Sequence, residues 1–271
     1  MPKVLKIDLK FSKCITPKLF KTKSLNYFFF SAERRNRRTK IYTSILSKKF
    51  VLKNVTLCSG ILKKNYQRVL SPDIIYFKNK YFLFYEFKKN NRTGIAMAVS
   101  INLIKWKFIK ELFFERKSNI SYGSPKCIIN KKNNSIFLYY YKSGKNFKRI
   151  YYSKLDLNFN IIKNYNLPIV DNYSDLEHYS VYAPEIIYEK NKYKMFYSGW
   201  GGKLIKGRIF SMTSNNGIKW INKKIIHQGK KNNDTYKHYS EPSFGYINKK
   251  KYLFFEACDL NNNWKILYKK I

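Results

Sequence analysis

The sequence predicts an all-β fold, a five-bladed β-propeller, from a fivefold repeat, a second repeated mark and the strand count of the last copy. The segment 182–200, YAPEIIYEKNKYKMFYSGW, has four related segments elsewhere in the 271-residue chain. Regular periods of tens of residues are typical of propellers and solenoids. One proline marks each copy, 53 to 59 residues after the previous one: Pro17, Pro72, Pro125, Pro184 and Pro242.

A serine and an aromatic residue form the second repeated mark. The serine follows four of the prolines by 27 to 30 residues, and the aromatic residue follows the serine by six. Because the spacing between the proline and the serine–aromatic pair is nearly constant in four copies, the two marks together indicate a structural repeat. The pairs are Ser44–Phe50, Ser100–Trp106, Ser153–Phe159 and Ser214–Trp220.

The apolar runs predict the strands in order. Residues 3–11, KVLKIDLKF, alternate as one strand. The first four repeats then predict four strands each: 18–21, 26–32, 39–45 and 50–57; 73–77, 80–87, 93–100 and 106–114; 126–130, 135–141, 148–153 and 159–163; 185–189, 192–198, 208–214 and 219–227. The fifth repeat predicts only 243–247, 250–257 and 264–270.

The last repeat lacks a fourth strand, and one additional strand, residues 3–11, precedes the first repeat. Four antiparallel strands in meander order form a propeller blade. We therefore expect residues 3–11 to complete blade five and close the ring, which removes an exposed sheet edge. A two-sheet sandwich does not predict five equivalent copies. The expected single domain is 1–271, with blades near 15–57, 70–114, 123–165, 182–227 and 240–271 plus 3–11.

Composition narrows the class of protein. Apolar residues make up 44% of the chain, including 24 Tyr and 21 Phe, which supports a packed core and argues against disorder. No apolar run reaches the roughly 18–20 residues of a membrane span, and no secretory signal is visible, so we expect a cytoplasmic protein. The four cysteines form no close-paired metal motif, and we expect no metal and no cofactor: Cys14, Cys58, Cys127 and Cys258.

The charge is strongly basic, with 55 Lys and Arg against 16 acids and a formal net charge of +39. AT-rich coding favours Lys over Arg, but it does not explain the shortage of acids. The surface will therefore attract polyanions such as nucleic acid, anionic lipid or acidic glycans. The lysines are dispersed in turns, which favours a solvated surface. Nucleic-acid binding is the least favoured, because the aromatic residues lie in core strands and not on exposed platforms.

Several of these segments resemble the five-bladed glycoside hydrolases of families 43, 32, 62 and 68. LSPDIIYFKNKYFLFYE (70–86) is similar to their W-A-P-D segment, and the proline-marked strands and S-x5-W hairpins match their blades. The resemblance implies carbohydrate chemistry in the central channel, performed by a base or nucleophile, an acid and a supporting Asp. Thr16 and Ser124 stand where that family has its base and its supporting Asp. The usual catalytic set therefore does not carry over.

Three other carboxylates mark the starts of inner strands and are our candidate catalytic residues. Asp73 and Glu185 directly follow their prolines, whereas Glu241 directly precedes its own. The three stand on different sides of their prolines, so they need not all face one channel. The alternative is that each accepts hydrogen bonds from turn amides. Glu33, Glu86 and Glu256 end second strands, where repetition favours a structural role, although Glu86 and Glu256 could line the channel mouth.

The candidate substrate-binding residues lie beside these strand starts. His178 and His238 occupy matching His-Tyr-Ser loops, and histidine binds sugars, phosphates or metals near neutral pH. Trp200 lies among glycines and could stack on a sugar ring. The alternatives are a repeat-derived structural pair of histidines and simple packing of the indole. The full set is His178, His238, Tyr182, Trp200 and Tyr122.

Three functions remain open from the sequence. The first is a glycosidase or sugar-transferring protein that uses Asp73, Glu185 or Glu241. The second is a catalytically silent propeller that binds a glycan or a protein, and the third is a polyanion-binding protein. We favour a carbohydrate-active protein whose partner is an oligosaccharide or glycan, with acidic glycans included. The loss of both Asp–Pro positions leaves catalysis undecided.

Overall fold

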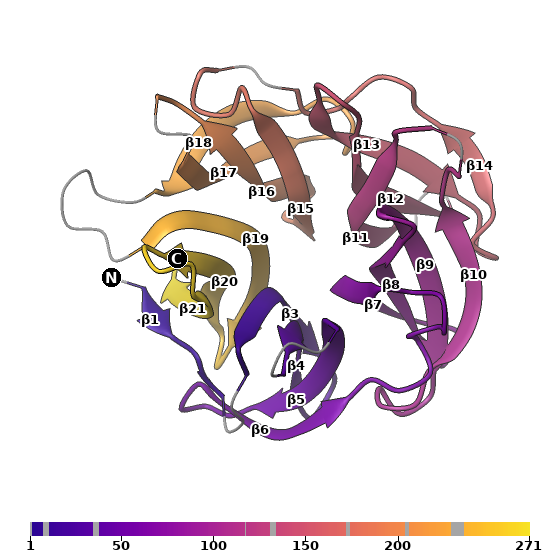
Figure 1. Cartoon of the computed structure of the whole chain (residues 1–271), viewed down its shortest axis with the longest axis vertical. Coiled ribbons are helices and arrows are strands. Elements are labelled where there is room, and N and C mark those ends of the chain that lie inside the picture. The colour runs from indigo at the N-terminus through magenta and orange to yellow at the C-terminus, as the bar shows by residue number, and fades with distance from the viewer. Residues whose placement is uncertain are drawn as a thin grey trace.

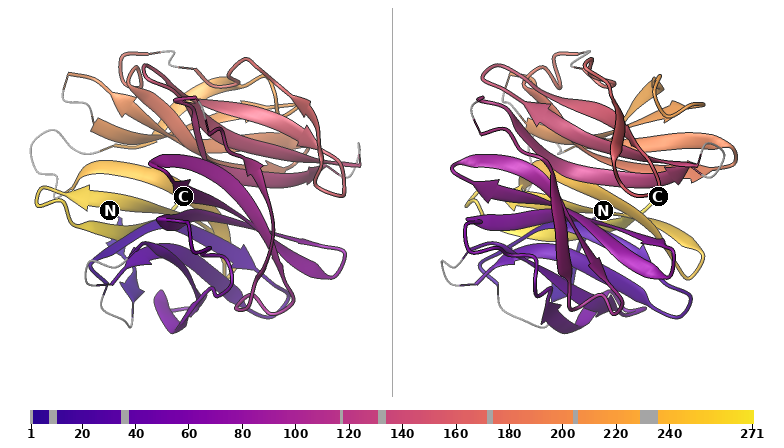
Figure 2. Two further views of the ribbon diagram at one scale, coloured as in Figure 1. Left: turned by 45° about the vertical axis from the view of Figure 1, so that its right-hand side comes forward. Right: turned by 90° about the vertical axis from the view of Figure 1, so that its right-hand side faces the viewer.

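The computed structural model describes residues 2–7, 11–34, 38–116, 118–130, 134–171, 174–203, 206–228 and 236–271. All regular structure in these residues is β, in five sheets. The sheets stand around a central axis (Figure 1), and their strands run from one face of the ring to the other (Figure 2). The predicted five-bladed propeller is confirmed. No helix of the described residues is long and apolar enough to cross a membrane.

Each blade is a four-stranded antiparallel meander with its first strand nearest the axis. Blades one and two contain β3 (Lys13–Lys21), β4 (Asn26–Glu33), β5 (Lys40–Leu46) and β6 (Val51–Leu57), then β7 (Arg68–Phe77), β8 (Lys80–Lys89), β9 (Arg92–Ser100) and β10 (Lys107–Phe113). Blades three and four contain β11 (Ser121–Asn130), β12 (Ser135–Ser143), β13 (Lys148–Leu155) and β14 (Ile161–Asn164), then β15 (Ser180–Glu189), β16 (Lys192–Gly201), β17 (Lys206–Ser214) and β18 (Ile221–His227). Blade five contains β19 (Tyr236–Ile247), β20 (Lys250–Asp259) and β21 (Trp264–Lys270).

The N-terminal segment closes the ring. β1 (Lys3–Val4) pairs antiparallel with β21 and becomes the fourth strand of blade five, as predicted. β2 (Lys6–Ile7) pairs in parallel with β6 and adds a fifth strand to blade one. Leu5, between them, is 3% exposed. The expected strand 3–11 is thus divided between two blades, and its residues 8–10 lie outside the described residues.

The inner strands begin several residues earlier than the sequence predicts, because the prolines do not start them. Each proline lies in a β-bulge within its strand, for example between Ile15 and Lys18 of β3. A proline has no N–H to donate to a ladder, and a bulge leaves a residue unpaired, so the two are compatible. The residue before each proline has a φ of 45° to 54°: Thr16, Ser71, Ser124, Ala183 and Glu241.

The aromatic residues pack between neighbouring blades. Phe28 of blade one meets Phe254 of blade five with ring centroids 5.1 Å apart, and Phe196 of blade four lies 5.8 Å from Phe244 of blade five. Such contacts bury large apolar areas and fix one blade against the next. The ring of blades in turn sets the positions of the side chains on the axis.

Candidate functional site

The residues on either side of the five prolines form two layers on the propeller axis. They line one narrow hollow, to which Thr16 and Glu241 contribute from before their prolines, and Asp73 and Glu185 from after theirs. Its water-accessible volume is about 20 Å³, enough for about one water molecule. The axis is therefore almost filled.

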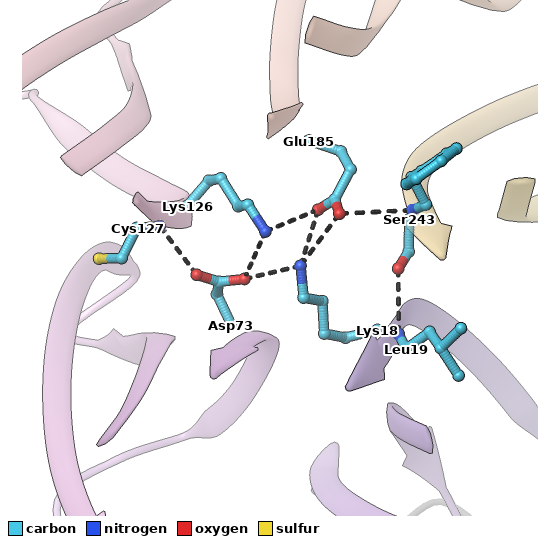
Figure 3. A network of polar contacts seen from close by, with 8 residues as sticks. Lys18, Leu19, Asp73, Lys126, Cys127, Glu185 and Ser243 are labelled. Carbon is cyan, nitrogen blue, oxygen red and sulfur yellow. Dashed lines mark hydrogen bonds and ion pairs between the residues drawn. The ribbon is translucent and has the colours of Figure 1, made fainter. Parts of the chain in front are cut away.

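An ion quartet of Lys18, Asp73, Lys126 and Glu185 fills one layer (Figure 3). The Lys18 Nζ lies 2.8 Å from Asp73 Oδ1 and 2.8 Å from Glu185 Oε2. The Lys126 Nζ lies 3.1 Å from Asp73 Oδ1 and 3.3 Å from Glu185 Oε2. These four side chains are at most 10% exposed. The residue after the proline in four blades thus supplies two cations and two anions in alternation around the axis.

Backbone amides complete the pairing of the two acids. Cys127 N donates to Asp73 Oδ2 at 2.8 Å, and Phe244 N donates to Glu185 Oε1 at 3.3 Å. Burial raises the pKa of Asp73, but Lys126 and Lys18 outweigh it, so the net pKa lies below the usual value. Asp73 is therefore ionised at neutral pH and bound to both lysines. The structure places two of the three predicted catalytic carboxylates in this quartet, where each is paired with two lysines.

The third predicted carboxylate, Glu241, belongs to a different group of charges. Ser124 Oγ donates to Glu241 Oε1 at 2.9 Å, and Ser124 N donates to Glu86 Oε2 at 3.2 Å. Glu256 accepts hydrogen bonds from Thr16 N at 3.0 Å and Ser240 Oγ at 2.6 Å. We name Glu86, Glu241, Glu256 and the adjacent Lys148 the mouth cluster.

Thr16 and Ser124 therefore hold two glutamates of the mouth cluster by their backbone amides. These are the positions at which the resemblance leads one to expect aspartates. The carboxylates of this mouth come instead from blade five, which supplies Glu241 and Glu256, and from blade two, which supplies Glu86. Residues two apart share a face of a regular strand, so alternation would not separate Glu241 from Asp73 and Glu185. The β-bulge at each proline separates them.

The three glutamates of the mouth cluster have raised pKa values. Burial is the main cause for each, and for Glu241 the neighbouring charges of Glu256 and Glu86 raise the pKa further. Nearby carboxylates cannot all ionise together in a buried site. Glu86 and Glu256 are buried, whereas Glu241 is partly exposed. The raised pKa favours the protonated form of Glu241, and Glu241 is partly exposed, unlike Glu86 and Glu256.

Lys148 contributes the positive charge of the mouth cluster. Its Nζ lies 3.7 Å from the ring centroid of Tyr182 and 4.2 Å from that of Tyr141, both cation–π distances. Burial lowers the pKa of Lys148, while Glu86, Glu241 and Glu256 oppose that shift. Lys148 was not predicted from the sequence, because it is the first residue of a third strand and no repeated mark falls at that position.

An aromatic wall of Tyr141, Tyr182, Trp200 and His238 adjoins the mouth cluster. The rings of Tyr141 and Tyr182 are 6.4 Å apart and perpendicular, and Trp200 packs against both. The Trp200 and His238 rings stack at 4.2 Å. Burial and the charges of nearby lysines lower the pKa of His238, so its ring is neutral at pH 7. Three predicted substrate contacts, Tyr182, Trp200 and His238, thus form one surface.

The other two predicted contacts lie elsewhere. Tyr122 donates a hydrogen bond to the Glu115 carboxylate and stacks on Phe113, between blades two and three. His178 lies in an exposed loop, with its Nδ1 2.6 Å from the carbonyl oxygen of Asp175. The described residues contain no group of three or more His, Cys, Asp or Glu side chains that could hold a metal ion.

Comparisons with known proteins show the fold. No protein family and no curated protein matches the sequence. Among solved structures, a thermostable family-43 glycoside hydrolase has a TM-score of 0.72 at 17% identity, covering 95% of this chain and 89% of that one. The native Bacillus subtilis arabinanase has a TM-score of 0.68 at 19% identity, covering 96% and 97%. The Cellvibrio cellulosa α-L-arabinanase complexed with arabinohexaose has a TM-score of 0.71 at 14% identity, covering 96% and 92%.

Proposed function

We propose that this protein acts on glycans at the mouth cluster, as a glycosidase-type enzyme with Glu241 as the proton donor. The observation that carries the proposal is Glu241 itself, a partly exposed carboxyl of raised pKa beside two buried glutamates. The shared fold supports it, since arabinanases have this architecture and one of them is complexed with arabinohexaose.

Cleavage of a glycosidic bond needs a carboxylic acid and a carboxylate. The acid protonates the leaving oxygen, while the carboxylate activates water or attacks the sugar. A carboxyl whose pKa is raised by its surroundings holds its proton to a higher pH than a free carboxyl does, which suits Glu241 to the role of the acid. We assign Glu86 as the carboxylate partner. Burial raises the pKa of Glu86, but the positive charges of Arg68 and Lys148 and the amide of Ser124 oppose that shift and favour its ionised form.

The aromatic wall supplies the binding surface. Trp200 is the partly exposed ring of this wall and offers apolar area against which the C–H face of a sugar ring can pack. Lys148 is held against Tyr182 and faces the glutamates, so its ammonium can donate hydrogen bonds to sugar hydroxyl groups. A glycan would thus lie over blades three to five with a glycosidic oxygen near Glu241.

The test is turnover of a panel of aryl glycosides and oligosaccharides, with arabinosides included, by wild type and two variants. Glu241→Gln removes the proton donor and should lower kcat by about 10²–10⁴-fold while oligosaccharide binding is kept. Glu33→Gln is the matched control, because Glu33 lies at the end of a second strand, as Glu86 and Glu256 do, but accepts a hydrogen bond from Thr39 and lies outside the mouth cluster. Full activity of the Glu241→Gln variant would contradict the proposal.

A catalytically silent glycan-binding propeller is the second candidate. It is favoured by the burial of Glu86 and Glu256, 3% and 6% exposed, both of which accept backbone amides. In that case no substrate of the panel is turned over. Calorimetry would still detect oligosaccharide binding, and Trp200→Ala would abolish it.

A further inference from the structure

We propose that the face of the propeller opposite the mouth cluster is a docking surface for an anionic lipid bilayer. This hairpin face consists of the turns that follow the first and third strands of the blades. The proline-flanking residues of all five inner strands meet at one level on the axis, so the turns that follow those strands emerge together on one face. Figure 2 shows the strands running between the two faces of the ring.

Lysines occupy the inner turns of this face in four blades. Lys23 lies in the turn of blade one, Lys80 follows the turn of blade two, and Lys192 and Lys250 follow those of blades four and five. All four are exposed, and Lys78 and Lys190 add a second exposed charge to blades two and four. The corresponding turn of blade three, 131–133, lies outside the described residues. The lysines therefore form a ring of positive charge around the axis.

Acidic residues are sorted to the other face. Among the described residues, the turns of the hairpin face contain two carboxylates, Asp156 and Glu189. Asp156 accepts hydrogen bonds from the backbone amides of Asn158 and Asn160, and Glu189 pairs with Lys251 at 2.8 Å. Codon bias acts on the whole chain and cannot sort charges by face. Within the described residues, the turns of the hairpin face thus carry many lysines and few acids, and this arrangement is a property of the fold.

Exposed apolar side chains accompany the lysines. Tyr76 and Tyr188 occupy matching positions, four residues after the prolines of blades two and four, and are 53% and 43% exposed. Leu25 in the turn of blade one is 38% exposed, and Ile101 in an outer turn of blade two is 78% exposed. Tyrosine and aliphatic side chains among lysines are typical of surfaces that enter the headgroup region of a membrane.

A bilayer fits these features better than a nucleic acid does. The charges surround the axis on several blades, which suits a planar anionic surface contacted by many turns at once, whereas a nucleic acid would follow one stripe or groove. Docked in this way, the protein would leave the mouth cluster facing water. The docking surface does not depend on chemistry at Glu241.

Flotation with lipid vesicles tests the proposal. The hairpin-face variant is Lys80→Gln, Lys192→Gln and Lys250→Gln together. Its matched control is Lys64→Gln, Lys145→Gln and Lys203→Gln, three exposed lysines from turns of the other face. Both variants have the same net charge, and all six side chains are exposed, so circular dichroism should show intact folds.

Wild type should bind vesicles that contain phosphatidylserine, should not bind pure phosphatidylcholine, and should dissociate as salt rises. The hairpin-face variant should lose about tenfold or more in partitioning, since each lysine near the surface contributes substantially, and the control should bind like wild type. Equal losses in both variants would mean diffuse attraction by net charge, which overturns the proposal. So would the absence of vesicle binding at low salt, or tighter binding of a DNA duplex that the hairpin-face variant weakens.

Discussion

At the scale of single residues, two positions of the repeat, one on each side of the proline, give an acid two different roles. Glu241 precedes its proline and enters the mouth cluster, whereas Glu185 follows its proline and enters the ion quartet. In the quartet, lysines lower the pKa of Asp73 and favour its ionised form. In the mouth cluster, burial and the charges of neighbouring glutamates raise the pKa of Glu241 and favour its protonated form. The ion quartet stabilises the protein. The mouth cluster keeps a reactive proton, and its buried carboxyls lower the stability of the protein.

Glu241→Gln should therefore raise stability at neutral pH. The pKa of Glu241 is higher in the folded than in the unfolded state, so the folded state gains stability as pH falls from that raised value toward the ordinary one. At neutral pH this carboxyl destabilises the fold, and a neutral glutamine removes the penalty. Thermal unfolding should show a higher Tm than wild type at pH 7 and no gain near pH 4. An equal Tm difference at both pH values would contradict this account.

Gly123→Ala should disable the site through Glu86. A Cβ on Gly123 would lie 2.0 Å from Glu86 Oε2 and 2.6 Å from a ring carbon of Tyr141, so the carboxylate must move. Because a displacement of about 1 Å can cost about 10²-fold in rate, we expect a loss of that size in kcat. Gly245→Ala is the control, since its Cβ would crowd the flexible end of Leu19, away from the mouth cluster. Similar kinetics for the two variants would contradict the role of Glu86.

The sequence predicts part of this site and misses part of it. Glu241, Tyr182, Trp200 and His238 lie beside repeated marks, and the structure brings all four to one region. Lys148 could not be predicted, because it reaches the cluster from the third strand of another blade. The repeat predicts which residues reach the axis, but it does not predict which charges compensate one another there.

At the scale of strands, the repeated marks correspond to two local structures. The prolines mark bulges, and two of the four serines cap the turns between third and fourth strands. Ser100 Oγ accepts the amides of Asn102 and Leu103, and Ser214 Oγ accepts those of Asn216 and Gly217. Strand number and order were predictable because these marks recur. The starts of the inner strands were not, since proline usually argues against a ladder position.

Removal of residues 1–5 should destabilise the protein and promote its association. The deletion removes β1 and the buried Leu5, leaving β21 as an exposed edge of blade five. Loss of a buried leucine alone costs about 2–5 kcal/mol, and unpaired edges favour pairing with other chains. Light scattering and thermal unfolding measure both effects. Lys3→Gln with Lys6→Gln, which keeps the strands, is the control, and a truncated protein that stays monomeric with an unchanged Tm would refute the closing role of β1.

At the scale of the whole molecule, the propeller has two kinds of connection between blades. Aromatic cores join neighbouring blades, as between Phe84 of blade two and Phe159 of blade three, 5.8 Å apart. The ion quartet joins four blades at once on the axis, including blades that are not neighbours. The quartet can form because each of its four blades has a bulge at the proline and places the next residue at the same level on the axis.

Lys18→Met should be strongly destabilising, because it leaves two buried carboxylates with one lysine. Breaking a buried ion pair by removing one partner costs about 3–5 kcal/mol. Lys251→Met is the control, because Lys251 pairs with Glu189 at the same 2.8 Å but is 44% exposed. A pair so exposed contributes at most about 1 kcal/mol. Urea unfolding at pH 7 compares the two losses.

The pH dependence of that loss tests its origin. The pKa of Asp73 is lower in the folded than in the unfolded state, so its stabilising effect is present above the unfolded value of about 4 and disappears as pH falls through the folded one. Wild type should thus lose stability in acid faster than Lys18→Met does, and the difference between them should shrink. A constant difference down to acidic pH would mean that Lys18 acts through packing of its carbon chain and not through the charge quartet.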